Sequence, residues 1–198
     1  MYSLLLDSSN TNLSVGICKD NVIIYKNSFS CWQRQSELMI PEIEKGLKEV
    51  NLRLIDFEEI VCAKGPGSYT GVRIALTIAK IISQMSGAKL VLVSSLQAMG
   101  NANKKYIAIM NARSARSYVG IYDHEKVILE DTIKTNEEVK ELIKEYSSFD
   151  VVGEGAYLGI ETILPNEVEG LLSLKDYIKA EEDVLKVKPV YLKDNYGI

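Results

Sequence analysis

Three glycines and a proline are grouped in the segment Gly65–Gly71, which reads GPGSYTG. An apolar run at 60–64 precedes it and a helical pattern at 71–86 follows it, so the segment joins a strand to a helix, with Thr70 as the expected N-cap. Backbone N–H groups at the start of a helix can bind an anion, and glycine lets a phosphate approach the backbone. The alternative is a tight turn without a ligand. Two catalytic motifs are excluded, because the segment has no P-loop lysine and Ser68 lacks the flanking glycines of a nucleophile elbow.

Metal and cysteine chemistry have little support in the sequence. The single histidine, His124, lies between two acidic residues in an expected hairpin link, so two histidine ligands cannot meet at a metal. A cysteine nucleophile usually needs a histidine base. Nothing brings His124 near Cys18, Cys31 or Cys62, and these are expected to be reduced cysteines of a cytoplasmic protein. We therefore expect no catalytic residue, no metal and no cofactor.

The composition sets limits on partners. The 198 residues have a net charge of −4, which argues against direct nucleic-acid binding by this chain. If RNA is involved, a more basic partner should make most of the phosphate contacts. The apolar start, Met1–Leu6, has no basic leader, and no apolar run approaches the length of a membrane span, so we expect no membrane partner.

The elements that must position these residues follow a repeated order. Hydrophobic periodicity predicts strands at 2–8, 13–18, 22–28, 60–64 and 89–93, with helices at 35–50, 71–86 and 94–102. It then predicts strands at 106–110, 118–122, 126–132 and 149–152, with helices at 136–146, 156–163 and 173–180 and an extended end at 188–193. Two strand-strand-strand-helix-strand-helix units predict an α/β fold with the duplicated ribonuclease-H-like lobes of the actin, sugar-kinase and Hsp70 superfamily. We expect a first lobe at 1–104 and a smaller, reduced lobe at 105–198.

The loops that carry chemistry in this superfamily are altered here. ATP-using members have Asp-x-Gly-x-Thr after the first strand, whereas this chain has Asp7-Ser8-Ser9-Asn10-Thr11, so a serine side chain crowds the phosphate position. The second lobe begins with Met110-Asn111-Ala112-Arg113 instead of an acidic pair that would assist hydrolysis. Arg113 and Arg116 are either anion contacts or solvated turn residues. The sequence predicts a nucleotide-binding fold with reduced chemistry; a peptidase or a small-molecule kinase is the alternative.

The helix at 71–86 is apolar over more of its surface than one sheet requires, which is an arc of about 100°. Its bulky face suits the sheet and comprises Ile74, Ile78, Ile81, Ile82 and Met85. Its small-residue stripe suits close approach of a second helix and comprises Gly71, Ala75, Ala79 and Ser83. That second helix is either 35–50 of the same chain or a helix of another subunit. In helix 35–50, Leu38 falls among charged residues and should be exposed, whereas Ile40 should be on the buried face.

Several pieces, in order along nearly the whole chain, resemble the bacterial TsaB (YeaZ) family, whose members support formation of threonylcarbamoyladenosine beside the tRNA anticodon. The pieces are Leu4–Ser8 with Thr11, Gln35-Ser36-Glu37 with Pro41, Lys64–Arg73, Ser94-Ser95-Leu96, Asn111-Ala112-Arg113, Val152–Ala156 and Pro189–Lys193. The piece Lys64–Arg73 is quite specific, because the catalytic paralogue TsaD has a different sequence there. The chain departs from the family pattern at Gln35, Asn111 and Lys193, where histidine, aspartate and arginine are usual. Gln35 removes the last indication of a metal site.

The resemblance implies an accessory role and not an enzyme. Such proteins bind TsaD, the metal- and substrate-binding subunit, with the ATPase TsaE joining the pair, and tRNA is contacted indirectly through the complex. They contact TsaD through helices of the first lobe and dimerise through the same region when alone; a self-sufficient homodimeric regulator is a further alternative. The expected partner-interface residues are Leu38, Met39, Glu42, Ile43, Gly71, Arg73, Ala75, Leu76, Ala79 and Ser83.

Overall fold

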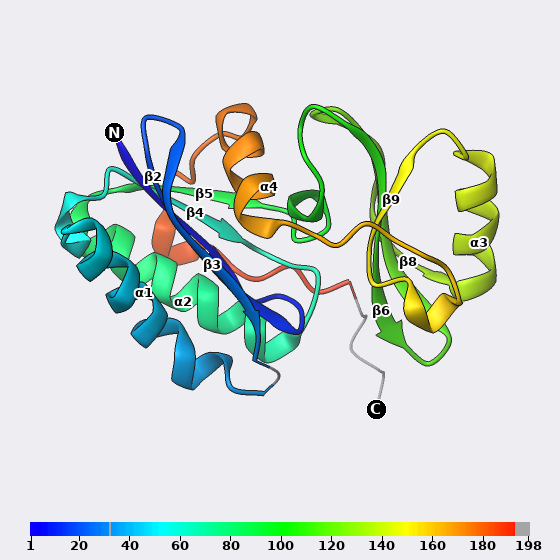
Figure 1. The fold of residues 1–198 in the computed structure, drawn as a ribbon, viewed down its shortest axis with the longest axis horizontal. Coiled ribbons are helices and arrows are strands. Elements are labelled where there is room, and N and C mark those ends of the chain that lie inside the picture. The colour runs from blue at the N-terminus through cyan, green and yellow to red at the C-terminus, as the bar shows by residue number, and fades with distance from the viewer. Residues whose placement is uncertain (32, 193–198) are drawn as a thin grey trace.

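The computed structural model describes residues 1–31 and 33–192, which form two β-sheets lying side by side with helices on their faces (Figure 1). The first sheet has the strand order β3-β2-β1-β4-β5 and the second the order β8-β7-β6-β9. In each sheet three consecutive strands are antiparallel, and the first of them pairs in parallel with a strand that follows a helix. The predicted α/β fold with duplicated lobes and a reduced second lobe is confirmed.

The elements are close to the predicted ones. The first sheet contains β1 (Tyr2–Asp7), β2 (Asn12–Lys19), β3 (Val22–Ser30), β4 (Glu59–Ala63) and β5 (Lys89–Val93), with helices α1 (Gln35–Val50) and α2 (Tyr69–Ser86) between them. The second contains β6 (Lys105–Arg113), β7 (Arg116–Asp123), β8 (Lys126–Thr135) and β9 (Asp150–Gly153), with α3 (Asn136–Glu145) before β9 and α4 (Glu167–Leu174) after it. Within the described residues, no helix has the length and apolarity that crossing a membrane requires.

Three predicted helices were wrong in extent. The helices expected at 94–102 and 156–163 are single 3₁₀ turns at Gln97–Met99 and Ala156–Leu158. The first turn stops at Gly100, where a Cβ atom would lie 2.3 Å from the ring of Tyr106, and the second stops at Gly159 in the left-handed region. The helix expected at 173–180 begins earlier as α4, because the Asn166 side chain caps the Glu169 N–H, and it ends in a 3₁₀ turn at Lys175–Tyr177.

Strand β1 is buried on both faces, as its Leu4-Leu5-Leu6 run predicts. Leu4 and Leu6 point into a core shared with α1 and α2, whereas Leu5 points into a core shared with Val168 and Leu171 of α4. Helix α4 therefore returns from the second sheet to cover the opposite face of the first one (Figure 1). The division into lobes at residues 104 and 105 stays a proposal. The packing of α4 shows that a segment after residue 105 completes the core of the first lobe.

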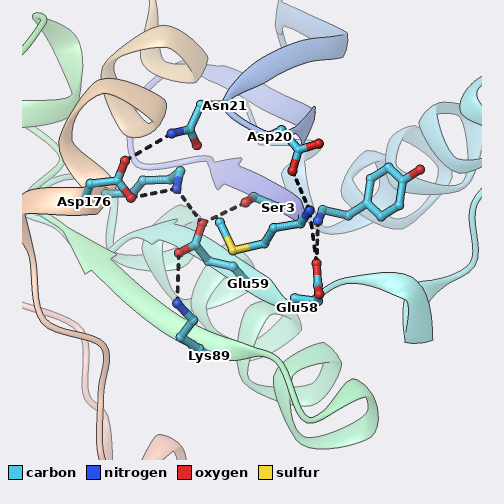
Figure 2. A network of polar contacts seen from close by, with 10 residues as sticks. Ser3, Asp20, Asn21, Glu58, Glu59, Lys89 and Asp176 are labelled. Carbon is cyan, nitrogen blue, oxygen red and sulfur yellow. Dashed lines mark hydrogen bonds and ion pairs between the residues drawn. The ribbon is translucent and has the colours of Figure 1, made fainter.

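The end of α4 is fixed by a buried ion pair. The Nζ atom of Lys175 lies 3.0 Å from Oε2 of Glu59 and 2.9 Å from Oδ1 of Asp176. Ser3 donates its hydroxyl proton to the same Glu59 oxygen at 2.7 Å, and Lys89 lies near the other oxygen (Figure 2). The buried carboxylate is thus compensated by two cations and a hydroxyl, which is the condition under which a buried charge is tolerated.

Helix α2 faces the sheet with the side that was expected to face another helix. Ala75, Ala79 and Ser83 are buried in the core, while Ile81 and Met85 are exposed. Small side chains allow the helix axis to lie close to the sheet, and larger ones at these positions would hold it away. The prediction that the bulky face contacts the sheet was therefore wrong for Ile81 and Met85, although Ile82 is buried as expected.

Residues 184–192, the C-terminal strap, run along α2. Lys80 donates to the carbonyl oxygens of Leu185 and Val187 at 2.8 and 3.1 Å. The Val190 N–H donates to the Lys64 carbonyl at 2.8 Å, at the end of β4. The position predicted at Lys193 lies outside the described residues.

Candidate functional site

The three segments with candidate chemistry meet in one cleft between the sheets. The cleft has a volume of about 550 Å³. Its walls come from the β1–β2 turn, the start of α2, the end of β6 and two residues beyond it: Ser9, Asn10, Thr11, Gly67, Ser68, Tyr69, Thr70, Met110, Asn111, Ala112, Arg113, Tyr118 and Glu154. The structure thus brings together the altered Asp7–Thr11 loop, the glycine segment and the Asn111-Ala112-Arg113 piece. Arg116 is outside the lining and begins β7.

The glycine segment packs tightly on the β1–β2 turn. The Ser68 N–H donates to the Ser9 carbonyl at 2.6 Å, and a Cβ atom on Gly67 would lie 2.2 Å from that carbonyl oxygen. The helix N-cap is Ser68 and not Thr70 as expected, because the Ser68 hydroxyl accepts the Gly71 N–H at 3.3 Å. Two of the N–H groups that an anion would use are therefore occupied within the chain, which favours the tight-turn alternative.

A pair of buried carboxyl groups lies behind this turn. Oδ1 of Asp7 accepts the Ser9 N–H at 2.7 Å, whereas Oδ2 of Asp7 and Oγ of Ser9 are buried without a hydrogen-bond partner among the described residues. Glu167, the first residue of α4, accepts from Nδ2 of Asn10 at 2.8 Å and from Oγ of Ser14 at 3.3 Å. Burial, and then the neighbouring Glu167, raise the pKa of Asp7 to about 7. Sequence reasoning missed Glu167, since no pattern connects it to a loop so distant in the chain.

The remaining reactive side chains are placed as the sequence suggests. His124 is exposed and its Nδ1 lies 2.6 Å from Oδ1 of Asp123. Cys18, Cys31 and Cys62 are free and buried. Burial raises the pKa of Cys18 to about 12 and that of Cys62 well above its usual range. In the part of the chain that the structure describes, no three histidine, cysteine or acidic side chains gather as metal ligands.

Most residues expected at the partner interface are buried inside this chain. Leu38, expected to be exposed, is half-buried, and Arg73 is exposed. The buried members are Met39, Glu42, Ile43, Gly71, Ala75, Leu76, Ala79 and Ser83. Their burial within this chain argues against direct contact with a partner, and the interface itself stays a prediction. Gly71 is the extreme case, since a Cβ atom there would lie 1.9 Å from the Ser8 carbonyl oxygen.

A different set of side chains forms the open face of α1 and α2. A depression of about 370 Å³ lies between the helices and is lined by Ser36, Tyr69, Thr70, Arg73, Ile74, Thr77 and Ile78. Ile40, predicted to be buried, is exposed on α1, and Ile81 and Met85 are exposed on α2. We call these ten residues the α1–α2 face. The clustering of exposed apolar side chains on adjacent helices is typical of a protein-binding surface.

Tyr69 and Arg73 of the α1–α2 face form an aromatic cluster with Tyr191 of the strap. The rings of Tyr69 and Tyr191 stack with their centroids 4.9 Å apart, and the Arg73 guanidinium carbon lies 4.1 Å from the Tyr69 centroid. Nε of Arg73 also donates to the Tyr191 hydroxyl at 2.8 Å. Sequence reasoning missed Tyr191 here, because only the return of the strap to α2 brings it beside Tyr69.

Comparison with known proteins defines the family. A family model described as "TsaD: tRNA N6-adenosine threonylcarbamoyltransferase" matches residues 31–147, more than half of the chain. The "tRNA threonylcarbamoyladenosine biosynthesis protein TsaB" of Bacillus subtilis is 30% identical over 67% of this chain and 60% of that protein. The chain belongs to the TsaB (YeaZ) family.

Other TsaB proteins and solved structures agree with this membership. The match spans less than two thirds of the Bacillus protein, but the TsaB protein of Buchnera aphidicola (subsp. Schizaphis graminum) is 27% identical over 77% of this chain and 78% of its own length. The structure of YeaZ from Pseudomonas aeruginosa superposes with a TM-score of 0.80 at 20% identity, covering 96% of this chain and 99% of that one. The ethanolamine utilization protein EutJ from Carboxydothermus hydrogenoformans, at a TM-score of 0.52 and 14% identity, has a related fold.

The structure shows what Gln35 does at the position where the TsaB pattern has histidine. Gln35 is buried at the start of α1, and its Nε2 donates to the Asn10 carbonyl at 3.3 Å. This amide therefore fixes the same β1–β2 turn that Ser68 and Glu167 contact. A neutral, hydrogen-bonded glutamine at this position acts as a support for the turn.

Proposed function

We propose that this TsaB-family chain acts in tRNA threonylcarbamoyladenosine biosynthesis as a non-catalytic scaffold that binds a TsaD-type subunit and helps to recruit a TsaE-type ATPase. The observation that carries this proposal is the α1–α2 face, which exposes Ile40, Ile81 and Met85 and also includes Tyr69 and Arg73, on which Tyr191 packs. Aromatic residues and arginine are the residue types that dominate protein–protein affinity.

The cleft supports the accessory part of the proposal. Ser9 fills the position where ATP-using relatives of this fold have glycine, and its carbonyl already accepts the Ser68 N–H. The three thiols are buried, and His124 is on an exposed turn away from them. The side chains that could do nucleophilic or acid–base chemistry are thus not assembled with the partners they would need.

The family match supports the choice of partner. Because residues 31–147, which include α1 and α2, match the model of the TsaD family, we infer that a TsaD-type subunit has a similar pair of helices. Two similar apolar helix pairs can pack against one another in the manner of an isologous dimer. We infer that the same face forms a homodimer when the chain is alone, that tRNA is contacted through the complex, and that the complex is cytoplasmic.

The proposal is tested by placing charge on the α1–α2 face. Ile81→Glu combined with Met85→Glu should abolish co-purification with a TsaD-type subunit, while the circular dichroism spectrum and melting temperature remain those of the parent. The matched control is Val127→Glu with Ile128→Glu, two similarly exposed apolar residues on β8. Threonylcarbamoylation of tRNA, assayed with each component omitted in turn, should require this chain. Undiminished TsaD binding by the α2 double variant would contradict the interface, and full modification without this chain would contradict the function.

A further inference from the structure

The first residue of α4 carries a buried negative charge with only neutral hydrogen-bond donors around it. Glu167 is 1% exposed. One of its carboxylate oxygens accepts from Nδ2 of Asn10 at 2.8 Å and the other from Oγ of Ser14 at 3.3 Å. Both donors belong to the β1–β2 region, so this single side chain attaches the start of α4 to the first sheet.

Asp7 at the end of β1 is a second buried carboxyl beside Glu167. It is 2% exposed, one oxygen accepts the Ser9 N–H, and the other has no hydrogen-bond partner among the described residues. The Ser9 hydroxyl is likewise buried without a hydrogen bond of ordinary geometry, although its contact with the Asp7 carboxyl lowers the pKa of Asp7, by less than burial raises it. An ionised carboxylate oxygen that is buried without a good hydrogen-bond donor is unfavourable, and protonation of the carboxyl removes that cost.

No positive group balances this pair within residues 1–31 and 33–192. The titratable groups that face Asp7 are Glu167 from α4 and the Cys62 thiol from β4. Further along α4, Glu169 is exposed and paired with Lys26, and Lys175 is occupied by Glu59 and Asp176 at the other end of the helix. Two neighbouring carboxylates without a cation cannot both ionise in a buried site at moderate cost.

We propose that Asp7 carries a proton in the folded protein, and that this proton allows the start of α4, with Glu167, to pack against the β1–β2 turn. Asp7 is the carrier because only one of its oxygens accepts a hydrogen bond of ordinary geometry, whereas both oxygens of Glu167 accept one. As the pH rises and the proton leaves, the two like charges repel, and α4 loosens from the turn that forms one wall of the cleft. Since the pKa of Asp7 is raised to about 7, this release falls in the neutral range.

A proton on Asp7 makes the stability of the folded protein depend on pH. An acid whose pKa is raised on folding binds its proton more tightly in the folded state, so the protein loses stability as the pH rises from the unfolded-state pKa toward the folded-state one. For one linked proton, the unfolding equilibrium constant changes by at most about tenfold per pH unit in that range.

The decisive measurement is urea unfolding of the full chain from pH 5 to pH 8.5, compared between the parent and Asp7→Asn. An asparagine has the shape of the protonated acid and cannot release a proton. We expect the parent to lose stability toward pH 8, and Asp7→Asn to lose less of it and to be the more stable protein at pH 8. Parallel pH profiles for the two proteins would overturn the proposal.

Two further measurements test the proposal independently, in case Asp7→Asn does not fold. Carbon-13 NMR of the Asp7 carboxyl in the parent should show a titration near neutral pH, and an aspartate that titrates in its ordinary range would contradict the proposal. Unfolding at pH 8 with added MgCl₂, CaCl₂ or KCl distinguishes a metal ion from the proton. A cation that stabilises the parent but not Asp7→Asn or Glu167→Gln would show that the pair holds a metal ion, and the proton proposal would be wrong.

Discussion

Glu167 and Lys175 are buried charges at opposite ends of α4, and they attach that helix to opposite ends of β1. Glu167 contacts the turn that follows the strand, through Asn10 and Ser14. Lys175 contacts Glu59, which also accepts a hydrogen bond from Ser3 at the strand's beginning. The apolar residues of α4 provide the area of contact, and the two charges determine its register on the sheet.

Removal of the Lys175 charge should destabilise the protein strongly. Lys175→Met leaves Glu59 buried with only Ser3 and the more distant Lys89, and we expect a loss of about 3 kcal/mol in the free energy of unfolding. The matched control is Lys179→Met, which breaks an exposed pair with Glu182 and should change stability by no more than about 1 kcal/mol. Urea unfolding measures both. Equal effects of the two substitutions would show that the buried pair has no special role.

Charge on the small-residue stripe should unfold the chain instead of selectively blocking a partner. Ala79 is fully buried against the first sheet, so Ala79→Glu places a carboxylate in the core and should reduce stability by about 3 kcal/mol or more. Thr77→Glu, on the exposed side of the same helix, is the control and should melt near the parental temperature. Thermal melting followed by circular dichroism distinguishes them. A folded Ala79→Glu protein that fails to bind a TsaD-type subunit would show that the small-residue stripe contacts the partner.

Gly71 should not tolerate a methyl group. In Gly71→Ala the new Cβ atom would lie 1.9 Å from the Ser8 carbonyl oxygen, so the start of α2 or the β1–β2 turn must move. We expect a loss of about 2 kcal/mol, although alanine is the better helix former. Ser36→Ala, at an exposed position near the start of α1, serves as the comparison. Stability equal to the parent would mean that the contact between these two segments relaxes freely.

The aromatic cluster should contribute to both strap order and partner affinity. Arg73→Ala removes the hydrogen bond to Tyr191 and the stacking on Tyr69, so we expect faster hydrogen exchange in residues 184–192. Affinity for a TsaD-type subunit should fall by about 1–2 kcal/mol, as is usual for a well-packed interface arginine. Tyr191→Phe loses only the hydroxyl and should have a smaller effect. Titration calorimetry with unchanged affinity for Arg73→Ala would place the cluster outside the interface.

The thiols should be unreactive in the folded protein. Burial raises the pKa of Cys18 to about 12 and raises those of Cys31 and Cys62, so very little thiolate is present at pH 8. Labelling with a disulfide reagent at pH 8 should be slow in the native state and should reach all three cysteines in denaturant. Rapid labelling of one cysteine in the native protein would contradict its burial.

The order of the elements along the chain and the duplicated fold were predictable from sequence, because alternation and short links are local features. The buried side of α2 was not predictable, because the helix has apolar residues on two faces. The face with the small side chains packs on the sheet, since it lets the helix lie closer. The pairing of Asp7 with Glu167, and of Tyr69 with Tyr191, depends on late segments returning to the first lobe. No local pattern marks such a return, and the position of a partner on α1 and α2, which only the family resemblance suggests, stays a prediction.

The return of α4 also has a consequence for how the protein is made. Strands β1 to β5 leave the ribosome early, but Leu5, Val61 and Val91 remain without their apolar cover until residues 167–174 have been synthesised. The nascent chain thus displays one uncovered face of a nearly complete sheet for most of its elongation. During that interval we expect the first lobe to depend on chaperones, and a ribosome-stalled chain ending before Glu167 should bind them more strongly than one in which α4 has emerged.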